Sequence, residues 1–112
     1  MDIRKTEEQG VMILAPDGRL DSNSAPILEQ EIGLIGSDDS GYHLLLDFSK
    51  VEYISSAGLR VVLKTVKERQ AASKSFAVSN MQDHVREVFE ISGFDSYVTI
   101  HTDTPQALDN FK

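Results

Sequence analysis

The sequence predicts an α/β fold: a mixed β-sheet that opens with a hairpin, is parallel in its later part and packs against about four helices. Short apolar runs such as Val11–Ala15 and Leu44–Leu46 alternate with segments whose apolar residues recur at helical spacing. Strands that alternate with helices form parallel pairs, with the helices against the sheet. Neither an internal repeat nor a long linker interrupts this order, so we expect residues 1–112 to form one domain.

The opening hairpin is predicted from two strands and a turn. Asp2–Glu8 is polar with a weak alternation, which is typical of an edge strand whose charges discourage unwanted pairing. Gln9-Gly10 predicts a tight turn into Val11–Ala15, a buried strand. The breakers Pro16-Asp17-Gly18 are expected to end that strand.

The first helix is indicated by capping residues at Ser22-Asn23-Ser24 and by Pro26, which suits a first helical turn. Its apolar stripe consists of Ile27, Leu28, Ile32 and Ile35. Gly36–Gly41 reads as a loop, and it lacks the lysine and the glycine spacing of a phosphate loop. Within it, Asp38-Asp39 could hold a weak cation, although an exposed acidic loop is the simpler interpretation.

The central stretch predicts a buried strand, a short polar connection and a second helix. The strand is Leu44–Leu46, and Asp47, Ser49 and Lys50 end it. The helix has an apolar face at i, i+3, i+4 and i+7, formed by Leu59, Val62, Leu63 and Val66. Ser55 and Ser56 precede this face, where a serine oxygen can accept an unpaired amide of the first turn.

The remainder of the chain predicts strand, helix, strand and helix. Ser75–Val78 is a strand, and Ser79 or Asn80 is expected to cap a helix with a stripe at Val85, Val88 and Phe89. Ser92-Gly93 ends that helix, and Tyr97–Ile100 is the expected last strand. Thr102–Thr104 and Pro105 begin a short final helix with apolar Ala107, Leu108 and Phe111.

Composition narrows the class of protein. With 40% hydrophobic and 26% charged residues the chain can build a core. The absence of cysteine excludes disulfides and thiolate chemistry. A formal net charge of -7 argues against a general nucleic-acid binder. Neither a signal peptide nor an apolar run of membrane-spanning length is visible, so we expect a cytoplasmic protein that does not enter membranes.

The serine turn has two interpretations. The N-terminus of a helix attracts anions through its free amides and its dipole, and Ala57 and Gly58 would leave a serine hydroxyl approachable. Gly58 costs a helix roughly 0.8–1 kcal/mol relative to alanine, which indicates that something approaches the backbone closely. The simpler interpretation is a plain cap followed by a small residue that helps packing.

A resemblance favours the functional interpretation. The run Asp47–Leu59 resembles the signature of the STAS domain, and more narrowly that of the small, free-standing anti-sigma factor antagonists of bacteria. Gly18-Arg19-Leu20-Asp21 resembles the glycine-x-leucine-aspartate loop of the same family, and the likeness covers nearly the whole chain in length and element order. The chain departs from the commonest pattern at Ser55, where aspartate is frequent, and at Ala57, where a second hydroxyl residue is frequent.

The resemblance implies a function in partner switching. The phosphate-accepting serine of the family falls on Ser56, with Ser55 as the alternative acceptor. The unphosphorylated chain would bind an anti-sigma factor that is itself a serine kinase, phosphorylation would release it, and a metal-dependent serine phosphatase would reset the switch. ATP and its metal would belong to those partners, so we expect a STAS domain with no cofactor, no metal and no enzymatic activity of its own. A small monomer with a transient interface is the simplest expectation for its oligomeric state.

The topology also predicts a binding surface. Sites in such sheets collect where strands end and helices begin, so the loop Asp21, Ser22, Asn23 and the loop Ser55-Ser56 should be neighbours. With Ala57, Gly58 and Arg60 they form the expected partner-binding surface. Arg60 lies at i+4 from Ser56 and is expected to meet an acidic partner or the new phosphate. Lys64 and Lys67 extend a basic stripe that is more simply a solvated face.

Two aspartates near the predicted site have expected roles. Two roles are equally expected for Asp21, as a helix cap or as part of the kinase-facing surface, while Asp47 is expected to tie down the serine loop.

One alternative to the partner-switching function is a non-switching STAS adaptor of a transport complex. The other is a small serine hydrolase, but the three histidines, His43, His84 and His101, lie in no catalytic or metal-binding pattern, and the nucleophile elbow is missing around Ser56.

Overall fold

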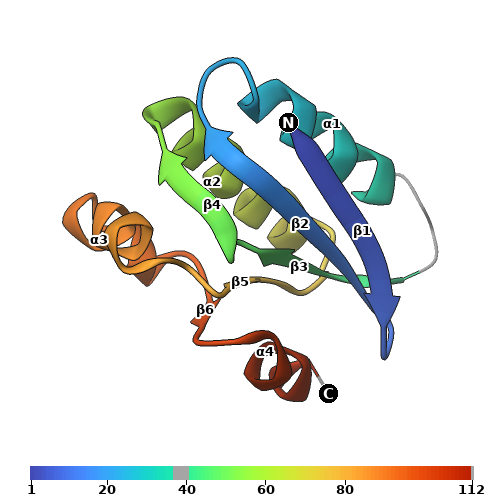
Figure 1. The fold of residues 1–112 in the computed structure, drawn as a ribbon. Helices are drawn as coiled ribbons and strands as arrows, with labels where there is room; N and C mark the ends of the chain where they lie inside the picture. Colours follow the sequence, from blue (N-terminus) through green and yellow to red (C-terminus); the bar gives the residue numbers. More distant parts are fainter. Residues whose placement is uncertain (37–40, 112) are drawn as a thin grey trace.

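The computed structural model describes residues 1–36 and 41–111, and these form the predicted mixed α/β architecture (Figure 1). The strands are β1 (Asp2–Glu8), β2 (Val11–Leu20), β3 (His43–Asp47), β4 (Lys50–Ile54), β5 (Phe76–Ser79) and β6 (Ile100–His101). The helices are α1 (Ala25–Gly36), α2 (Ser56–Ala71), α3 (Asp83–Ile91) and α4 (Thr104–Asn110), with one 3-10 turn, η1 (Phe94–Ser96).

The sheet order is β1-β2-β3-β5-β6, with β4 also paired to β2. β1 and β2 form the predicted antiparallel hairpin, and the other pairs are parallel. Gln9 and Gly10 both have positive φ, 55° and 78°, which is the conformation that a two-residue hairpin turn requires. The predicted hairpin and the parallel later part of the sheet are therefore confirmed.

The prediction that Pro16-Asp17-Gly18 ends the second strand is wrong, because β2 continues to Leu20. Its first part, Val11–Leu14, pairs with β3, and its last part, Asp17–Leu20, pairs with β4. Pro16 lies in the gap between these two partners, where the ladder needs no amide donor, so a residue that lacks an N–H is tolerated there.

β4 replaces what the sequence predicted to be only a polar connection between strand and helix. Gly18 pairs with Val51 and Arg19 with Tyr53, so Glu52 is the extra residue of a β-bulge. The bulge leaves two successive residues, Glu52 and Tyr53, exposed between buried Val51 and Ile54. This interruption of the period-two pattern is the reason that the strand was missed.

Buried side chains fill both faces of the sheet. On one face, residues of β2, β3 and β5 pack with α1 and α2; they include Leu14, Leu44, Leu46 and Val78. On the other face, a smaller cluster lies under α4 and consists of Val11, Ile13, Leu45, Ala77, Ala107 and Leu108. Consecutive residues of each strand thus supply opposite faces, as expected for a strand covered on both sides.

The two long helices largely follow the predicted stripes. In α1, Leu28, Ile32 and Ile35 are buried, but Ile27 is 40% exposed and lies outside the stripe. In α2, the predicted Leu59, Val62 and Val66 are buried and Leu63 is half-buried. Buried Arg69 fixes the end of α2, because its guanidinium donates to the carbonyls of Tyr42 and Ser75 at 2.8 Å.

The C-terminal part needs two corrections. The residue at the N-cap of α3 is Gln82 and not Ser79 or Asn80, since Ser79 belongs to β5 and Asn80 has a positive φ of 61°. The expected strand Tyr97–Ile100 shrinks to β6, because η1 and the turn after it occupy the preceding residues. The predicted start of α4 is confirmed, with Asp103 as the cap and Pro105 in the first turn.

The connection between α1 and β3 is described only in part. Of the predicted loop Gly36–Gly41, residues 37–40 lie outside the described residues. The prediction of an exposed acidic loop at Asp38-Asp39 therefore concerns residues outside the described part of the chain. Among the described residues, no helix has the length and apolar character that crossing a membrane requires.

Candidate functional site

The two predicted loops lie together at the same end of the sheet. β2 and β4 are parallel neighbours, so the loops that follow them start side by side (Figure 1). The amide of Ser55 donates to the carbonyl of Leu20 at 2.9 Å, which joins the two loops directly. Ser22 from one loop and Ala57 from the other line one cavity of about 300 Å³. The expectation that these loops are neighbours is therefore confirmed.

The Asp21 loop is closed by its own hydrogen bonds. The Asp21 carboxylate accepts from the amides of Ser24 at 3.1 Å and Asn23 at 3.0 Å. The buried Ser24 hydroxyl accepts from the Asp21 amide at 2.9 Å and donates to the Arg19 carbonyl at 2.6 Å. The backbone amides of Ser24 and then Asn23 lower the pKa of Asp21, because they stabilise its charged form. Asp21 thus holds the turn that leads into α1, and Ser24, which the sequence indicated only as one of three capping residues, is the buried centre of this network.

The two serines of the second loop have different environments. Ser55 is half-buried and is the N-cap of α2, with its hydroxyl accepting from the amide of Gly58 at 3.3 Å. Ser56 is the first residue of the helix and is exposed. Its hydroxyl has no hydrogen-bond partner in the part of the chain that the structure describes. The predicted cap is therefore Ser55, and Ser56 is the serine that a reagent or a partner can reach.

Gly58 is glycine because the chain packs tightly there. A Cβ at this position would lie 2.8 Å from Cγ1 of Ile54 and 2.9 Å from the carbonyl oxygen of Leu20. The close approach inferred from the sequence is thus made by the protein's own β2 and β4. Gly58 is buried, so its contribution to a binding surface is to hold the start of α2 against the two strand ends.

Arg60 is exposed and lies between two cavities. One is the 300 Å³ cavity between α1 and α2, which Ser22, Pro26 and Ala57 also line. The other, of about 420 Å³, lies on the opposite flank of α2 and is lined by Ser56, Leu59, Arg60, Leu63, Ser92 and Phe94. Among the described residues no carboxylate pairs with Arg60. Its charge is thus available next to Ser56.

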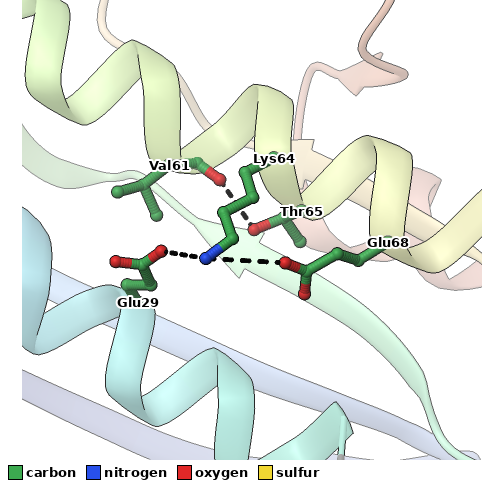
Figure 2. Close-up of polar contacts among 5 residues, drawn as sticks. All are labelled: Glu29, Val61, Lys64, Thr65 and Glu68. Atoms are coloured by element: carbon green, nitrogen blue, oxygen red, sulfur yellow. Dashed lines mark hydrogen bonds and ion pairs between the residues drawn. The ribbon is translucent and has the colours of Figure 1, made fainter.

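Lys64 differs from the other two cations of the basic stripe. Its ammonium lies 2.6 Å from the carboxylate of Glu29 on α1 and 3.7 Å from that of Glu68 (Figure 2). The hydrogen bond to Glu29 raises the pKa of Lys64. Behind it, the buried hydroxyl of Thr65 donates to the carbonyl of Val61 at 2.8 Å (Figure 2). Lys64 therefore joins α2 to α1, whereas Arg60 and Lys67 are unpaired among the described residues.

Asp47 is structural, as expected, but it ties down a different segment. Its carboxylate accepts from the amide of Ser49 at 2.9 Å and from the side-chain amide of Asn80 at 3.2 Å. Asn80 also donates to Thr104 at 2.9 Å, so this network joins the ends of β3 and β5 to the start of α4. Asp47 thus fixes the turn into β4, and it reaches the serine loop only through that strand.

Two of the three histidines make side-chain contacts with groups other than Ser56. His43 stacks on Phe111, with ring centroids 5.2 Å apart. The ring of His84 hydrogen-bonds to the carbonyl of Glu52, the bulge residue of β4. His101 lies in β6. Within residues 1–36 and 41–111, the structure shows no group of three or more side chains that could hold a metal ion.

Sequence reasoning missed two other features near the site. Arg19 lies over the ring of Tyr53, with its guanidinium carbon 4.2 Å from the ring centroid, and Tyr53 is 40% exposed. Phe94 lines the cavity beside Ser56 from η1. Neither was accessible from periodicity, because Tyr53 lies on the undetected β4 and η1 is too short to show a repeat.

The chain is similar to known proteins over its whole length. A family model described as the STAS domain matches residues 2–107. BtrV of Bordetella bronchiseptica, described as a candidate anti-sigma factor antagonist, is 35% identical over 112 residues, which cover 100% of this chain and 96% of BtrV.

Two solved structures share the fold. The crystal structure of TM1081 from Thermotoga maritima, also described as a candidate anti-sigma factor antagonist, matches with a TM-score of 0.90 and 21% identity over 97% of this chain and 93% of that one. The phosphorylated form of SpoIIAA from Bacillus matches with a TM-score of 0.74 and 18% identity over 99% of this chain and 100% of that one.

Proposed function

The chain belongs to the STAS domain family, and on that premise we propose that it is an anti-sigma factor antagonist whose binding is switched by phosphorylation of Ser56. Its similarity to BtrV extends over the whole chain, which supports the antagonist role. The proposed binding surface consists of Asp21, Ser22, Asn23, Ser55, Ser56, Ala57 and Arg60, with Gly58 packed behind them.

The observation that carries this proposal is the contrast between the two adjacent serines. The Ser55 hydroxyl is half-buried and is engaged in the cap of α2, so a kinase reaches it less easily than an exposed hydroxyl without a partner. The Ser56 hydroxyl is exposed at the first position of the helix, where free amides and the dipole favour a negative charge by about 0.3–1 kcal/mol. Phosphorylation of Ser56 is therefore compatible with the folded domain.

The direction of the switch follows from desolvation. A neutral hydroxyl can be covered by a partner at little cost, whereas a phosphate carries roughly -1.5 to -2 charges that lose their water. Covering such a charge without a cationic partner costs several kcal/mol. A penalty of roughly 4 kcal/mol weakens binding about a thousandfold. The unphosphorylated chain is thus the binding form and the phosphorylated chain is the released form.

The remaining elements of the pathway belong to the same proposal. The binding partner is an anti-sigma factor that is also the serine kinase, and a metal-dependent serine phosphatase restores the hydroxyl. The chain itself is a non-enzymatic, monomeric single domain that uses no cofactor. Since the kinase uses ATP, we also propose a cytoplasmic location.

Two alternatives make different predictions. A non-switching STAS adaptor of a transport complex would bind its partner regardless of the charge at Ser56. A serine hydrolase would need a base beside Ser56, but His43 and His84 contact other groups in the described chain.

The test is the affinity of purified anti-sigma factor for chains that differ only at position 56. We expect Ser56→Ala to bind as the wild type does, and the phosphorylated wild type to bind about a thousandfold more weakly. Ser56→Asp should bind less tightly than Ser56→Asn, which has the same size without the charge. Equal binding by Ser56→Asp and Ser56→Asn would refute the charge-based switch and favour the adaptor.

A further inference from the structure

The flank of α2 that faces away from α1 carries a second surface. The 420 Å³ cavity beside Ser56 shares Leu63 and Phe94 with a further cavity of about 330 Å³, which Val66, Lys67, Gln70 and Tyr97 complete. Because the two cavities share these side chains, they form one groove between α2 and the η1 segment. From Ser56 to Gln70 the groove follows α2 for about 21 Å, at 1.5 Å per residue.

The floor of this groove is apolar. Leu59 and Val66 are buried, Leu63 and Phe94 are half-buried, and Tyr97 is 67% exposed at one end. A tyrosine of that exposure beside leucine and phenylalanine is the kind of residue that anchors protein interfaces, because it offers a large apolar area with few rotatable bonds.

The rim of the groove is basic, although the protein has a formal net charge of -7. Two cations line it, Arg60 and Lys67, and among the described lining residues there is no carboxylate. Neither cation has an ion-pair partner in the described chain, whereas Lys64 on the other flank is paired with Glu29. An apolar floor between unpaired cations is complementary to an apolar segment flanked by carboxylates.

We propose that the groove between α2 and η1 binds an acidic amphipathic segment of a partner protein. The apolar side chains of the segment would rest on Leu63, Phe94 and Tyr97, and its carboxylates would face Arg60 and Lys67. Helix-in-groove binding uses this arrangement of apolar anchors and peripheral charges. The groove shares Ser56 and Arg60 with the proposed antagonist surface, but it extends along α2 to Gln70 and Tyr97. The proposal goes beyond the antagonist function, and its test requires no anti-sigma factor.

The test uses a synthetic peptide of about 14 residues, which as a helix covers about 21 Å. It carries leucine and phenylalanine on one face and glutamate on the other, and a control peptide carries lysine in place of glutamate. Titration into the full-length protein, followed by NMR, should give saturable shifts at the amides of Leu63, Lys67 and Tyr97 with the glutamate peptide only.

Matched variants locate the binding. Tyr97→Ala should weaken binding roughly tenfold, whereas Ile91→Ala, an even more exposed apolar residue outside the groove, should leave it unchanged. Lys67→Gln should weaken it about two- to fivefold, whereas Lys64→Gln on the other flank should not. Far-UV circular dichroism of each variant verifies that it is folded.

Several results would overturn the proposal. These are the absence of saturable binding, equal binding of the lysine peptide, and binding that survives both Tyr97→Ala and Lys67→Gln. Saturable binding of dodecanoate in place of the peptide would identify a fatty carboxylate as the occupant. Dimerisation of the wild-type chain that Tyr97→Ala abolishes would identify a second copy. None of these results bears on phosphorylation of Ser56, so the two proposals fail separately.

Discussion

The two polar loops at the end of β2 and β4 are neighbours of similar composition, but their hydroxyl and carboxylate groups are used differently. In the first loop, Asp21 and Ser24 form hydrogen bonds within the loop itself. In the second, Ser55 caps α2, while Ser56 keeps an exposed hydroxyl without a partner among the described residues. One loop is thus a scaffold, and the other presents an exposed hydroxyl on it.

Three contacts at the end of β2 link the two loops. The Ser55 amide binds the Leu20 carbonyl, Gly58 packs against that same carbonyl, and Ser24 binds the carbonyl of Arg19 one residue earlier. The strand end of β2 thus sets the positions of both loops. Substitutions at these contacts should disturb folding, whereas substitutions at Ser56 should disturb only regulation.

The largest effect on the scaffold is expected from Gly58→Ala. The added methyl group would lie 2.8–2.9 Å from Ile54 and from the side chain and carbonyl of Leu20, so the helix must move away. Overpacking of this kind costs about 1–3 kcal/mol, even though alanine favours a helix more than glycine does. Urea unfolding measures the loss, and Gly33→Ala, where a methyl group would meet nothing within 4 Å, is the matched control. A stability of Gly58→Ala equal to or above that of the control would contradict the packing account.

A somewhat smaller effect is expected from Ser24→Ala. The variant leaves the Arg19 carbonyl and the Asp21 amide without their hydroxyl partner, and such losses cost about 1–2 kcal/mol. Thermal unfolding should show a lower midpoint than for Ser22→Ala, whose side chain is exposed. Equal midpoints for the two variants would mean that the loop is not held by its internal network.

Ser55→Ala sharpens the distinction between the two serines. Loss of the cap should lower the free energy of unfolding by about 1 kcal/mol. Ser56→Ala, which removes a hydroxyl that has no partner among the described residues, should leave it nearly unchanged. Chemical denaturation of both variants measures this difference, and a larger loss in Ser56→Ala would reverse the assignment of the cap.

The smallest effect concerns pH. The pKa of Asp21 is lower in the folded chain, so the charged carboxylate stabilises the fold. This contribution to the free energy of unfolding is fully present above the ordinary aspartate pKa of about 3.9. The contribution is lost as the pH falls below that value and through the lowered pKa. Unfolding midpoints of wild type and Asp21→Asn should therefore converge as the pH falls below about 4. A difference between them that is constant with pH would show that the carboxylate charge contributes nothing.

The sequence was sufficient for the elements with strong local signals. The hairpin turn at Gln9-Gly10, the stripe of α2 and the start of α4 at Asp103 and Pro105 were predictable because turn chemistry, helical period and capping are local properties. The proximity of the Asp21 and Ser55 loops was also predictable, because the carboxyl ends of parallel strands meet at one edge.

The sequence was insufficient where the deciding contact is tertiary. β4 was missed because the bulge at Glu52 interrupts its alternation, and β2 was cut short because only the change of partner strand makes Pro16 acceptable. The division of roles between Ser55 and Ser56 follows from cap geometry, which two adjacent serines do not disclose. The pairing of Lys64 with Glu29, which lies 35 residues away, depends on how α1 packs on α2.

The most direct test of the central claim is to incubate the wild type, Ser55→Ala and Ser56→Ala with the purified anti-sigma kinase and ATP, and to map the phosphate by mass spectrometry. We expect phosphate on Ser56 in the wild type and in Ser55→Ala, and none in Ser56→Ala. Phosphate on Ser55 in the wild type, or undiminished phosphorylation of Ser56→Ala, would contradict it.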